Sequence, residues 1–142
     1  MAHTFHLAIP AGDLHNAIHF YCSVLGCTKG NSETNPPDSW CDINFWGNEL
    51  TLHSSSCKQT SEGHNVDMGN VQVPHFGVHL TADEFKDLKE KIIQNNIKFV
   101  EEPFIRFQGN VLEQETMFIK DPNGNVLELK TMVNPDALFD RS

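Results

Sequence analysis

Residues 118–129 read Phe-Ile-Lys-Asp-Pro-Asn-Gly-Asn-Val-Leu-Glu-Leu, and this stretch decides the fold. Proline presets φ for a turn, and Asn-Gly accepts a positive φ, so the Asp-Pro-Asn-Gly segment at 121–124 predicts a tight turn. The runs on either side of it favour strands over 113–120 and 124–131. The stretch therefore predicts a β-hairpin.

The second strand of this hairpin places a carboxylate among apolar residues. Side chains alternate between the two faces of a strand, so Glu128 shares a face with Val126 and Lys130, opposite Leu127 and Leu129. A carboxylate that faces a closed interior without a partner costs free energy. Either this face of the strand is hydrated, or Glu128 has a cation beside it.

The N-terminal half of the chain predicts a strand, a helix and further strands in that order. A strand over 5–9 leads to Asp13, a favourable helix N-cap, and the apolar spacing that follows predicts a helix ended by Gly26. The β-rich runs after the helix end in a strand over 47–53 that begins Gly-Asn.

The C-terminal half repeats this order. A strand over 74–80 precedes a capping box formed by Thr81 and Glu84, and a second amphipathic helix follows. The last strand again begins Gly-Asn, at residues 124 and 125. The repeat predicts an α+β fold in which two βαβββ modules form one unit of structure.

The chain length is that of one domain. With 142 residues, we expect a single domain over 1–142 made of modules at about 3–54 and 73–131. The polar segment 55–72 is expected to be a linker, and residues 132–142 a surface tail.

Composition and charge exclude several classes of function. The formal net charge is -9, and the basic residues are scattered, which disfavours nucleic-acid binding and an anionic membrane surface. No apolar run approaches the length of a membrane span, and the N-terminal residues do not resemble a signal peptide, so a cytoplasmic location is expected. The four cysteines form no CxxC pair and are expected to be reduced thiols; they are Cys22, Cys27, Cys41 and Cys57.

The eight histidines differ in position. Four are expected at the surface or in ordinary packing: His3, His15, His19 and His64. The other four lie in predicted strands: His6, His53, His75 and His79. Two imidazoles and a carboxylate on one side of a metal ion, with open positions opposite, form the arrangement of non-haem Fe(II) oxygenases, which also suits Mn²⁺, Ni²⁺ or Zn²⁺. Spacing alone does not identify such a set here.

Four motifs resemble the vicinal oxygen chelate superfamily, which includes glyoxalases, bleomycin-resistance proteins and extradiol dioxygenases. They are His-Leu-Ala-Ile-Pro at 6–10, Phe-Tyr-Cys-Ser-Val-Leu-Gly-Cys at 20–27, Pro-His-Phe-Gly-Val at 74–78, and residues 118–129. The resemblance covers about residues 3–131. It implies the glyoxalase/dioxygenase-like fold, in which two βαβββ modules form a curled mixed sheet around a cup with a metal on its floor.

In this family the first and last strands of each module supply metal ligands. The matching positions here are His6, Thr51, His75 and Glu128, and three of them can bind a metal whereas Thr51 departs from the pattern. The departure disfavours the four-ligand glyoxalase I reaction. The resemblance thus implies a divalent metal (Fe, Mn, Ni or Zn, with Fe or Mn favoured) on His6, His75 and Glu128.

Other residues on the predicted cup face are candidates for catalysis or substrate binding. His53 and His79 are candidate acid–base residues, because an ordinary histidine pKa suits proton transfer near neutrality; for His53, the alternative is a hydrated histidine at the rim. The candidate substrate-binding residues are Thr51, Arg106, Thr116 and Phe118. Arg106 either holds an anionic substrate or caps a loop. Thr116 and Phe118 replace the cationic residues of fosfomycin-resistance enzymes, which disfavours that chemistry.

Two functions of different classes follow from the resemblance. One is a metal-dependent dioxygenase, lyase or isomerase that acts on a small substrate chelating the metal through vicinal oxygens. The other is a metal-free protein that sequesters a ligand, like the bleomycin-resistance members; a regulatory cup with a vestigial site is a third reading. The resemblance also implies a homodimer, in which the metal site lies within one chain or is shared between two.

Overall fold

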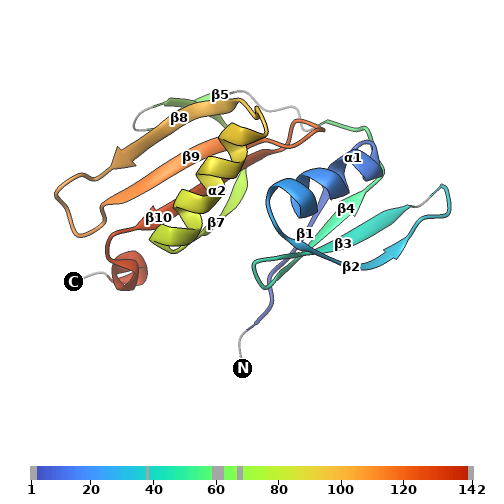
Figure 1. Cartoon of the computed structure of the whole chain (residues 1–142), viewed down its shortest axis with the longest axis horizontal. Coiled ribbons are helices and arrows are strands. Elements are labelled where there is room, and N and C mark those ends of the chain that lie inside the picture. The colour runs from blue at the N-terminus through green and yellow to red at the C-terminus, as the bar shows by residue number, and fades with distance from the viewer. Residues whose placement is uncertain (1–2, 38, 59–62, 67–68, 141–142) are drawn as a thin grey trace. The chain divides into compact units, whose positions relative to one another are not determined.

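The computed structural model describes residues 3–37, 39–58, 63–66 and 69–140, and for 63–66, 69 and 70 only the backbone (Figure 1). The chain divides into two compact units, Met1–Gln59 with Asp121–Asn125, and Thr60–Lys120 with Val126–Ser142. Each unit contains one four-stranded mixed sheet. The predicted α+β fold with two βαβββ modules is confirmed as two separate sheets.

The N-terminal unit contains the first module. Its elements are β1 (His6–Pro10), α1 (Leu14–Ile18), the π-helix η1 (His19–Val24), β2 (Thr28–Glu33), β3 (Trp40–Phe45) and β4 (Asn48–His53). The strand order is β1-β4-β3-β2, with β1 parallel to β4 and the other pairs antiparallel. The Asp13 side chain accepts a hydrogen bond from the Asn16 amide at 2.9 Å, as expected for the N-cap.

Alternating side chains give this first sheet two unlike faces. One face carries buried apolar residues: Ile9, Cys41, Ile43, Phe45, Leu50 and Leu52. The residues between them on the strands face the other way, and many are polar or charged: His6, Asp42, Asn44, Glu49, Thr51 and His53. A sheet with one apolar face is covered on that face by the helical segment, which leaves the polar face for function.

The C-terminal unit contains the second module. Its elements are β5 (Gly63–Val66), β6 (Gly69–Gln72), β7 (Phe76–His79), α2 (Ala82–Gln94), β8 (Phe99–Arg106), β9 (Gln114–Lys120), β10 (Val126–Met132) and the 3₁₀-helix η2 (Pro135–Phe139). The order β7-β10-β9-β8, with β7 parallel to β10, repeats the topology of the first sheet. Among the described residues, no helix is long and apolar enough to cross a membrane.

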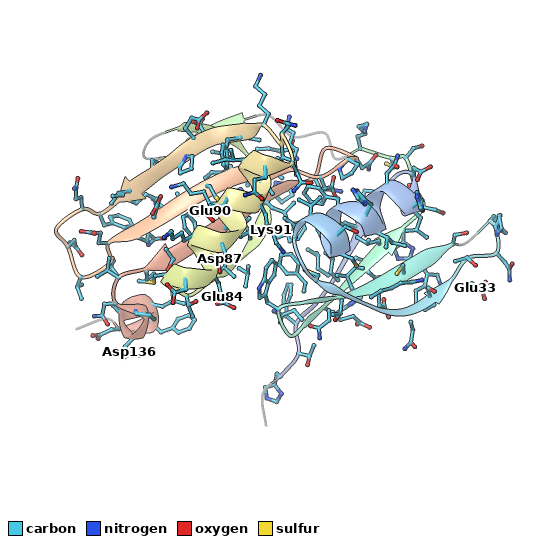
Figure 2. All side chains as sticks on the ribbon, viewed as in Figure 1. Glu33, Glu84, Asp87, Glu90, Lys91 and Asp136 are labelled. Atoms are coloured by element: carbon cyan, nitrogen blue, oxygen red, sulfur yellow. The ribbon has the colours of Figure 1, made fainter. Side chains whose placement is uncertain are left out.

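Helix α2 covers the apolar face of the second sheet. Thr81 and Glu84 form the predicted capping box, in which the Thr81 hydroxyl accepts from the Glu84 amide and the Glu84 carboxylate accepts from the Thr81 amide. The helix buries Phe85, Leu88 and Ile92. Figure 2 shows the exposed acidic residues of its outer face, Glu84, Asp87 and Glu90.

The segment between the modules contains structure that its composition does not predict. The expected linker 55–72 includes the antiparallel pair of β5 and β6. Val71 of β6 is buried against Phe118 and Val126, so this hairpin belongs to the core of the C-terminal unit. The expected tail contains the 3₁₀-helix η2. The four cysteines are free thiols; Cys41 is buried and Cys57 is exposed.

The turn after β9 is held by a buried carboxylate. Asp121 Oδ1 accepts hydrogen bonds from the amides of Asn123 and Asn125, both at 2.9 Å, and Gly124 has φ 89°. Asp121 Oδ2 accepts from the Tyr21 hydroxyl at 2.8 Å and from Asn125 Nδ2 at 2.8 Å. The side-chain amides of Asn123 and Asn125 both donate to the Pro10 carbonyl at 2.8 Å. These bonds explain why Asp121–Asn125 packs within the N-terminal unit.

Replacing Tyr21 by Phe tests this network. The Tyr21 side chain is fully buried, and burial, followed by the nearby Asp121 charge, raises its pKa well above 10. Tyr21→Phe leaves a buried carboxylate oxygen with one fewer donor, so we expect a loss of about 1–3 kcal/mol in the free energy of unfolding. Urea denaturation measures the loss. The control Ser39→Ala removes an exposed hydrogen bond to the Thr34 carbonyl and is expected to cost much less; equal losses would contradict the role of the network.

Candidate functional site

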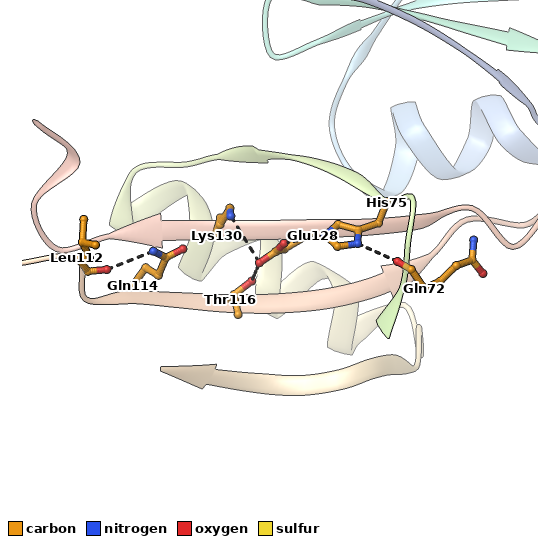
Figure 3. Close-up of polar contacts among 7 residues, drawn as sticks. All are labelled: Gln72, His75, Leu112, Gln114, Thr116, Glu128 and Lys130. Carbon is orange, nitrogen blue, oxygen red and sulfur yellow. Dashed lines mark hydrogen bonds and ion pairs between the residues drawn. The ribbon is translucent and has the colours of Figure 1, made fainter. Parts of the chain in front are cut away.

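The C-terminal unit brings together two of the three predicted metal ligands, His75 and Glu128 (Figure 3). His75 lies just before β7 and Glu128 lies on β10, and Nε2 of His75 is 3.1 Å from Oε1 of Glu128. Glu128 is a charged residue in a strand with buried leucines on either side, Leu127 and Leu129, and it is itself only 7 % exposed. Both oxygens of the carboxylate have partners within the protein, and the cation of Lys130 lies 3.7 Å from one of them.

Both ring nitrogens of His75 face acceptors. Nδ1 lies 2.8 Å from the Gln72 carbonyl oxygen, and Nε2 faces the Glu128 carboxylate. A neutral imidazole has one N–H and cannot donate to both. A metal ion shared by the imidazole and the carboxylate would satisfy Nε2 and Oε1 while Nδ1 donates to the Gln72 carbonyl. A backbone carbonyl on the remote ring nitrogen is the usual support of a metal-binding histidine.

The second oxygen of Glu128 also has partners. The hydroxyl of Thr116, on β9, donates to Oε2 at 2.7 Å and is fully buried. Nζ of Lys130 lies 3.7 Å from the same oxygen. In the structure the hydroxyl of Thr116 orients the carboxylate of Glu128, and its predicted contact with substrate stays a prediction.

Strand β7 approaches β10 closely at this point. Gly77 lies opposite Glu128, and a Cβ at Gly77 would overlap the backbone carbonyl oxygen of Glu128. A glycine is therefore required here for close contact between the strands, which fixes the position of His75 relative to the carboxylate.

His79 lies on the same face as Glu128, opposite Lys130 in the register. Its pKa is lowered from 6.5, first by burial and then by the Lys130 charge, while the Glu128 charge acts in the opposite direction. The neutral imidazole is thus the favoured form near neutral pH, and this form can accept a proton.

Two further predicted residues, Phe118 and Arg106, lie on strands of the second sheet. The ring of Phe118 meets His75 edge to face, with centroids 5.3 Å apart, and stacks with Phe104 at 6.4 Å. Phe118 thus packs against the imidazole. Arg106 pairs with Gln114 in the register of β8 and β9, and its guanidinium lies 4.8 Å from the centroid of the Phe107 ring.

The remaining predicted residues lie on the polar face of the first sheet. Nδ1 of His6 is 2.8 Å from Oε1 of Glu49. The Thr51 hydroxyl donates to Oδ1 of Asp42 at 2.7 Å, so a carboxylate that the sequence reading did not select lies beside the position where the family pattern has a ligand. His53 is exposed at the end of β4 and lines a cavity of about 390 Å³ in the N-terminal unit.

The donor set partly fits a divalent metal. An imidazole nitrogen and a carboxylate oxygen suit Fe, Mn or Zn; Glu128 is buried, His75 is half-buried, and both are oriented by neighbours. Across the described part of the chain, no three His, Cys, Asp or Glu residues gather closely enough to hold a metal. His6, the third predicted ligand, belongs to the other unit.

The fold and the imidazole–carboxylate pair define the class of this protein. The chain belongs to the Glyoxalase/Bleomycin resistance protein/Dioxygenase superfamily, whose family model matches residues 3–129. This confirms the resemblance stated from the sequence motifs.

Particular relatives share this fold over nearly the whole chain. A glyoxalase/bleomycin resistance protein/dioxygenase from Alicyclobacillus acidocaldarius is 33 % identical with a TM-score of 0.75, and the match covers 96 % of both chains. Virulence protein STM3117 of Salmonella typhimurium is 25 % identical over 128 residues, which are 90 % of this chain and 83 % of that protein. The fosfomycin resistance protein FosX of Listeria monocytogenes shares the fold at 14 % identity, with a TM-score of 0.64 and 92 % of both chains covered.

The sequence did not identify three residues as part of the candidate site: two on the polar face of the second sheet and one that orients His75. Lys130 and Gln114 lie on the same face as Glu128 and Thr116, and Gln72 provides the carbonyl that orients His75. Alternation along β9 and β10 already placed Lys130 and Gln114 on this face, so a signal was present for them. The Gln72 contact is made by a backbone atom, which residue type does not reveal.

Gly77→Ala tests the close approach of β7 and β10. The added methyl group would meet backbone rather than a movable side chain, so we expect a loss of about 2–4 kcal/mol in the free energy of unfolding, or failure to fold. Denaturant unfolding measures it. The control Gly30→Ala has its nearest contact at 3.4 Å, and a similar loss in both variants would argue against a special constraint at Gly77.

The lowered pKa of His79 predicts a pH dependence. The unfolded chain binds more protons than the folded chain between the folded pKa of His79 and 6.5, so the free energy of unfolding rises with pH through that window. NMR titration of the His79 ring should give a midpoint below 6.5. Lys130→Met should raise this midpoint without restoring it fully, because burial lowers the pKa of His79 more than the Lys130 charge does. A midpoint at or above 6.5 in the unsubstituted chain would contradict this account.

Proposed function

We propose that this protein is a metal-dependent enzyme of its superfamily, a dioxygenase or a lyase/isomerase, that acts on a small substrate with two vicinal oxygens. The observation that carries the proposal is the pair formed by the half-buried His75 and the buried Glu128. Both ring nitrogens of His75 face acceptors, and a shared metal ion removes that conflict without a second proton on the ring.

The surrounding residues support a metal-binding role for this pair. Gln72 orients His75, and Thr116 orients Glu128. A divalent ion, with Fe or Mn favoured, would supply the Lewis acidity that polarises the chelating oxygens of a substrate. His79 is placed on the same face with its neutral form favoured, so it is the proposed proton acceptor in the C-terminal unit.

Several residues of the proposal lie in the N-terminal unit. His6 is the proposed third ligand, contributed by the same chain or by a second copy in a homodimer. His53 is a second candidate acid–base residue, and Thr51 a candidate for substrate contact. The homodimer and the cytoplasmic location stay predictions.

Elemental analysis of protein purified anaerobically, without an affinity tag that carries nickel, tests the proposal. We expect about one metal ion per chain, lost in His75→Ala, Glu128→Ala and His6→Ala because each removes a ligand. Thr116→Val keeps the three ligands but removes the hydrogen bond that orients the Glu128 carboxylate, so metal affinity should fall by about 10–100-fold.

Glu115→Ala is the matched control, because this carboxylate also lies on the second sheet but pairs with Lys89 at 3.1 Å. Its metal content should be unchanged. Full metal content in Glu128→Ala would overturn the proposed site. Absence of metal in every variant and in the parent chain, even after reconstitution, would favour the ligand-sequestering function, in which His75, Thr116 and Lys130 satisfy Glu128.

A further inference from the structure

The polar face of the second sheet continues beyond the proposed metal ligands. Glu128 pairs with Phe118, the next pair on this face is Lys130 with Thr116, and the one after it is Met132 with Gln114. Same-face residues along a strand are roughly 7 Å apart, so these pairs form three successive rows. Thr116 and Lys130 of the second row contact Glu128, but Lys130 and, in the third row, Gln114 keep hydrogen-bonding capacity that these contacts do not use.

Gln114 has a buried acceptor without a donor. Its Nε2 donates to the Leu112 carbonyl at 3.2 Å, while no described residue donates to Oε1. The residue is only 7 % exposed. A buried carbonyl without a hydrogen bond costs about 1–3 kcal/mol, so a donor from outside the described residues would stabilise this oxygen. Figure 3 shows the amide of Gln114 on the same face as Thr116 and Lys130.

Lys130, a diagonal neighbour of Gln114 on the same face, has unused donors. Its Nζ is 3.7 Å from Glu128 Oε2, which is an ion-pair distance but too long for a hydrogen bond. No described residue accepts a hydrogen bond from Nζ, and the side chain is 25 % exposed. The ammonium group can therefore keep its charge interaction with Glu128 and bind a further acceptor.

We propose that Lys130 and Gln114 form a substrate-binding subsite for a hydroxycarboxylate, with the carboxylate on Lys130 and the hydroxyl donating to Gln114 Oε1. The inference rests on the proposed function and names the substrate class of that site. A hydroxyl suits Gln114 better than an ammonium donor, because Lys130 and Arg106 lie in neighbouring register positions and repel a cation.

The spacing of the two groups sets the size of the ligand. Lys130 and Gln114 are diagonal neighbours on β10 and β9, and such positions lie roughly 7–8 Å apart between backbones. Both side chains extend from the same face, so a short ligand of about three carbons in all, the carboxyl carbon included, fits. Lys130 and Gln114 would determine specificity, while the reacting oxygens bind elsewhere in the site.

Three small probes separate the two contacts. 3-Hydroxypropionate carries both groups, propionate lacks the hydroxyl, and 1,3-propanediol lacks the charge. Titration of each into the ¹⁵N-labelled full chain, followed by two-dimensional NMR, gives the affinities. We expect 3-hydroxypropionate to bind about five- to tenfold tighter than either analogue, and to shift the side-chain amide resonances of Gln114.

Two substitutions assign the contacts. Gln114→Met should make 3-hydroxypropionate and propionate bind equally, and Lys130→Met should make 3-hydroxypropionate and 1,3-propanediol bind equally. Lys120→Met is the matched control: it removes an exposed lysine of β9 and should leave all three affinities unchanged. Unchanged discrimination in Gln114→Met and Lys130→Met, or equal binding of the three probes to the parent chain, would overturn the subsite.

The titrations are made with EDTA-treated protein and with Zn²⁺ added, which separates the inference from the proposed function. Discrimination that depends on Lys130 and Gln114 in EDTA-treated protein supports the subsite even if the chain binds no metal. Metal bound by His75 and Glu128 without such discrimination leaves the proposed function standing and rejects the subsite.

Discussion

The burial of the Glu128 carboxylate is the constraint on which the second sheet depends. A charged group in an otherwise apolar strand is costly unless each of its oxygens has a partner. His75 faces one oxygen, and Thr116 and Lys130 face the other. These partners come from the segment before β7, from β9 and from β10 itself, so satisfying one carboxylate specifies the register of three neighbouring elements. The absence of a side chain at Gly77 permits the close strand contact that this arrangement needs.

Each module pairs a threonine hydroxyl with a carboxylate, but the two modules place these groups on opposite strands. Thr51 on β4 and Glu128 on β10 occupy equivalent positions in the two sheets, since each lies on the last strand and pairs with the first. In the second module the carboxylate is on the last strand and the threonine on its antiparallel neighbour; in the first, Asp42 carries the carboxylate on that neighbour and Thr51 the hydroxyl. The threonine–carboxylate hydrogen bond is therefore kept while its direction across the strands is reversed. Because of this exchange, the hydroxyl of Thr51 has a hydrogen-bond partner in Asp42.

The strands, the helix caps and the faces of the sheets were predictable because they depend on local rules. Asp13 and the Thr81–Glu84 box cap their helices as expected, and alternation correctly placed Glu128 and Lys130 on one face of the last strand. The pairing of β5 with β6 was not predictable, because its segment is polar and its stability comes from the packing of Val71 in the core of the second unit. The role of Thr116 was also not visible, since a buried hydroxyl and an exposed one look alike in sequence.

The sequence by itself determined the superfamily, the duplicated module and the candidate ligands, because periodicity, turn residues and short motifs act over a few neighbouring positions. Only the tertiary structure decided which of these groups meet. It joined His75 to Glu128 across 53 positions and fixed the remote nitrogen of His75 on a backbone carbonyl. It also buried Gln114 with an oxygen that no described residue satisfies. Such contacts depend on strand register and burial, which arise from the packing of the whole sheet and not from any one segment.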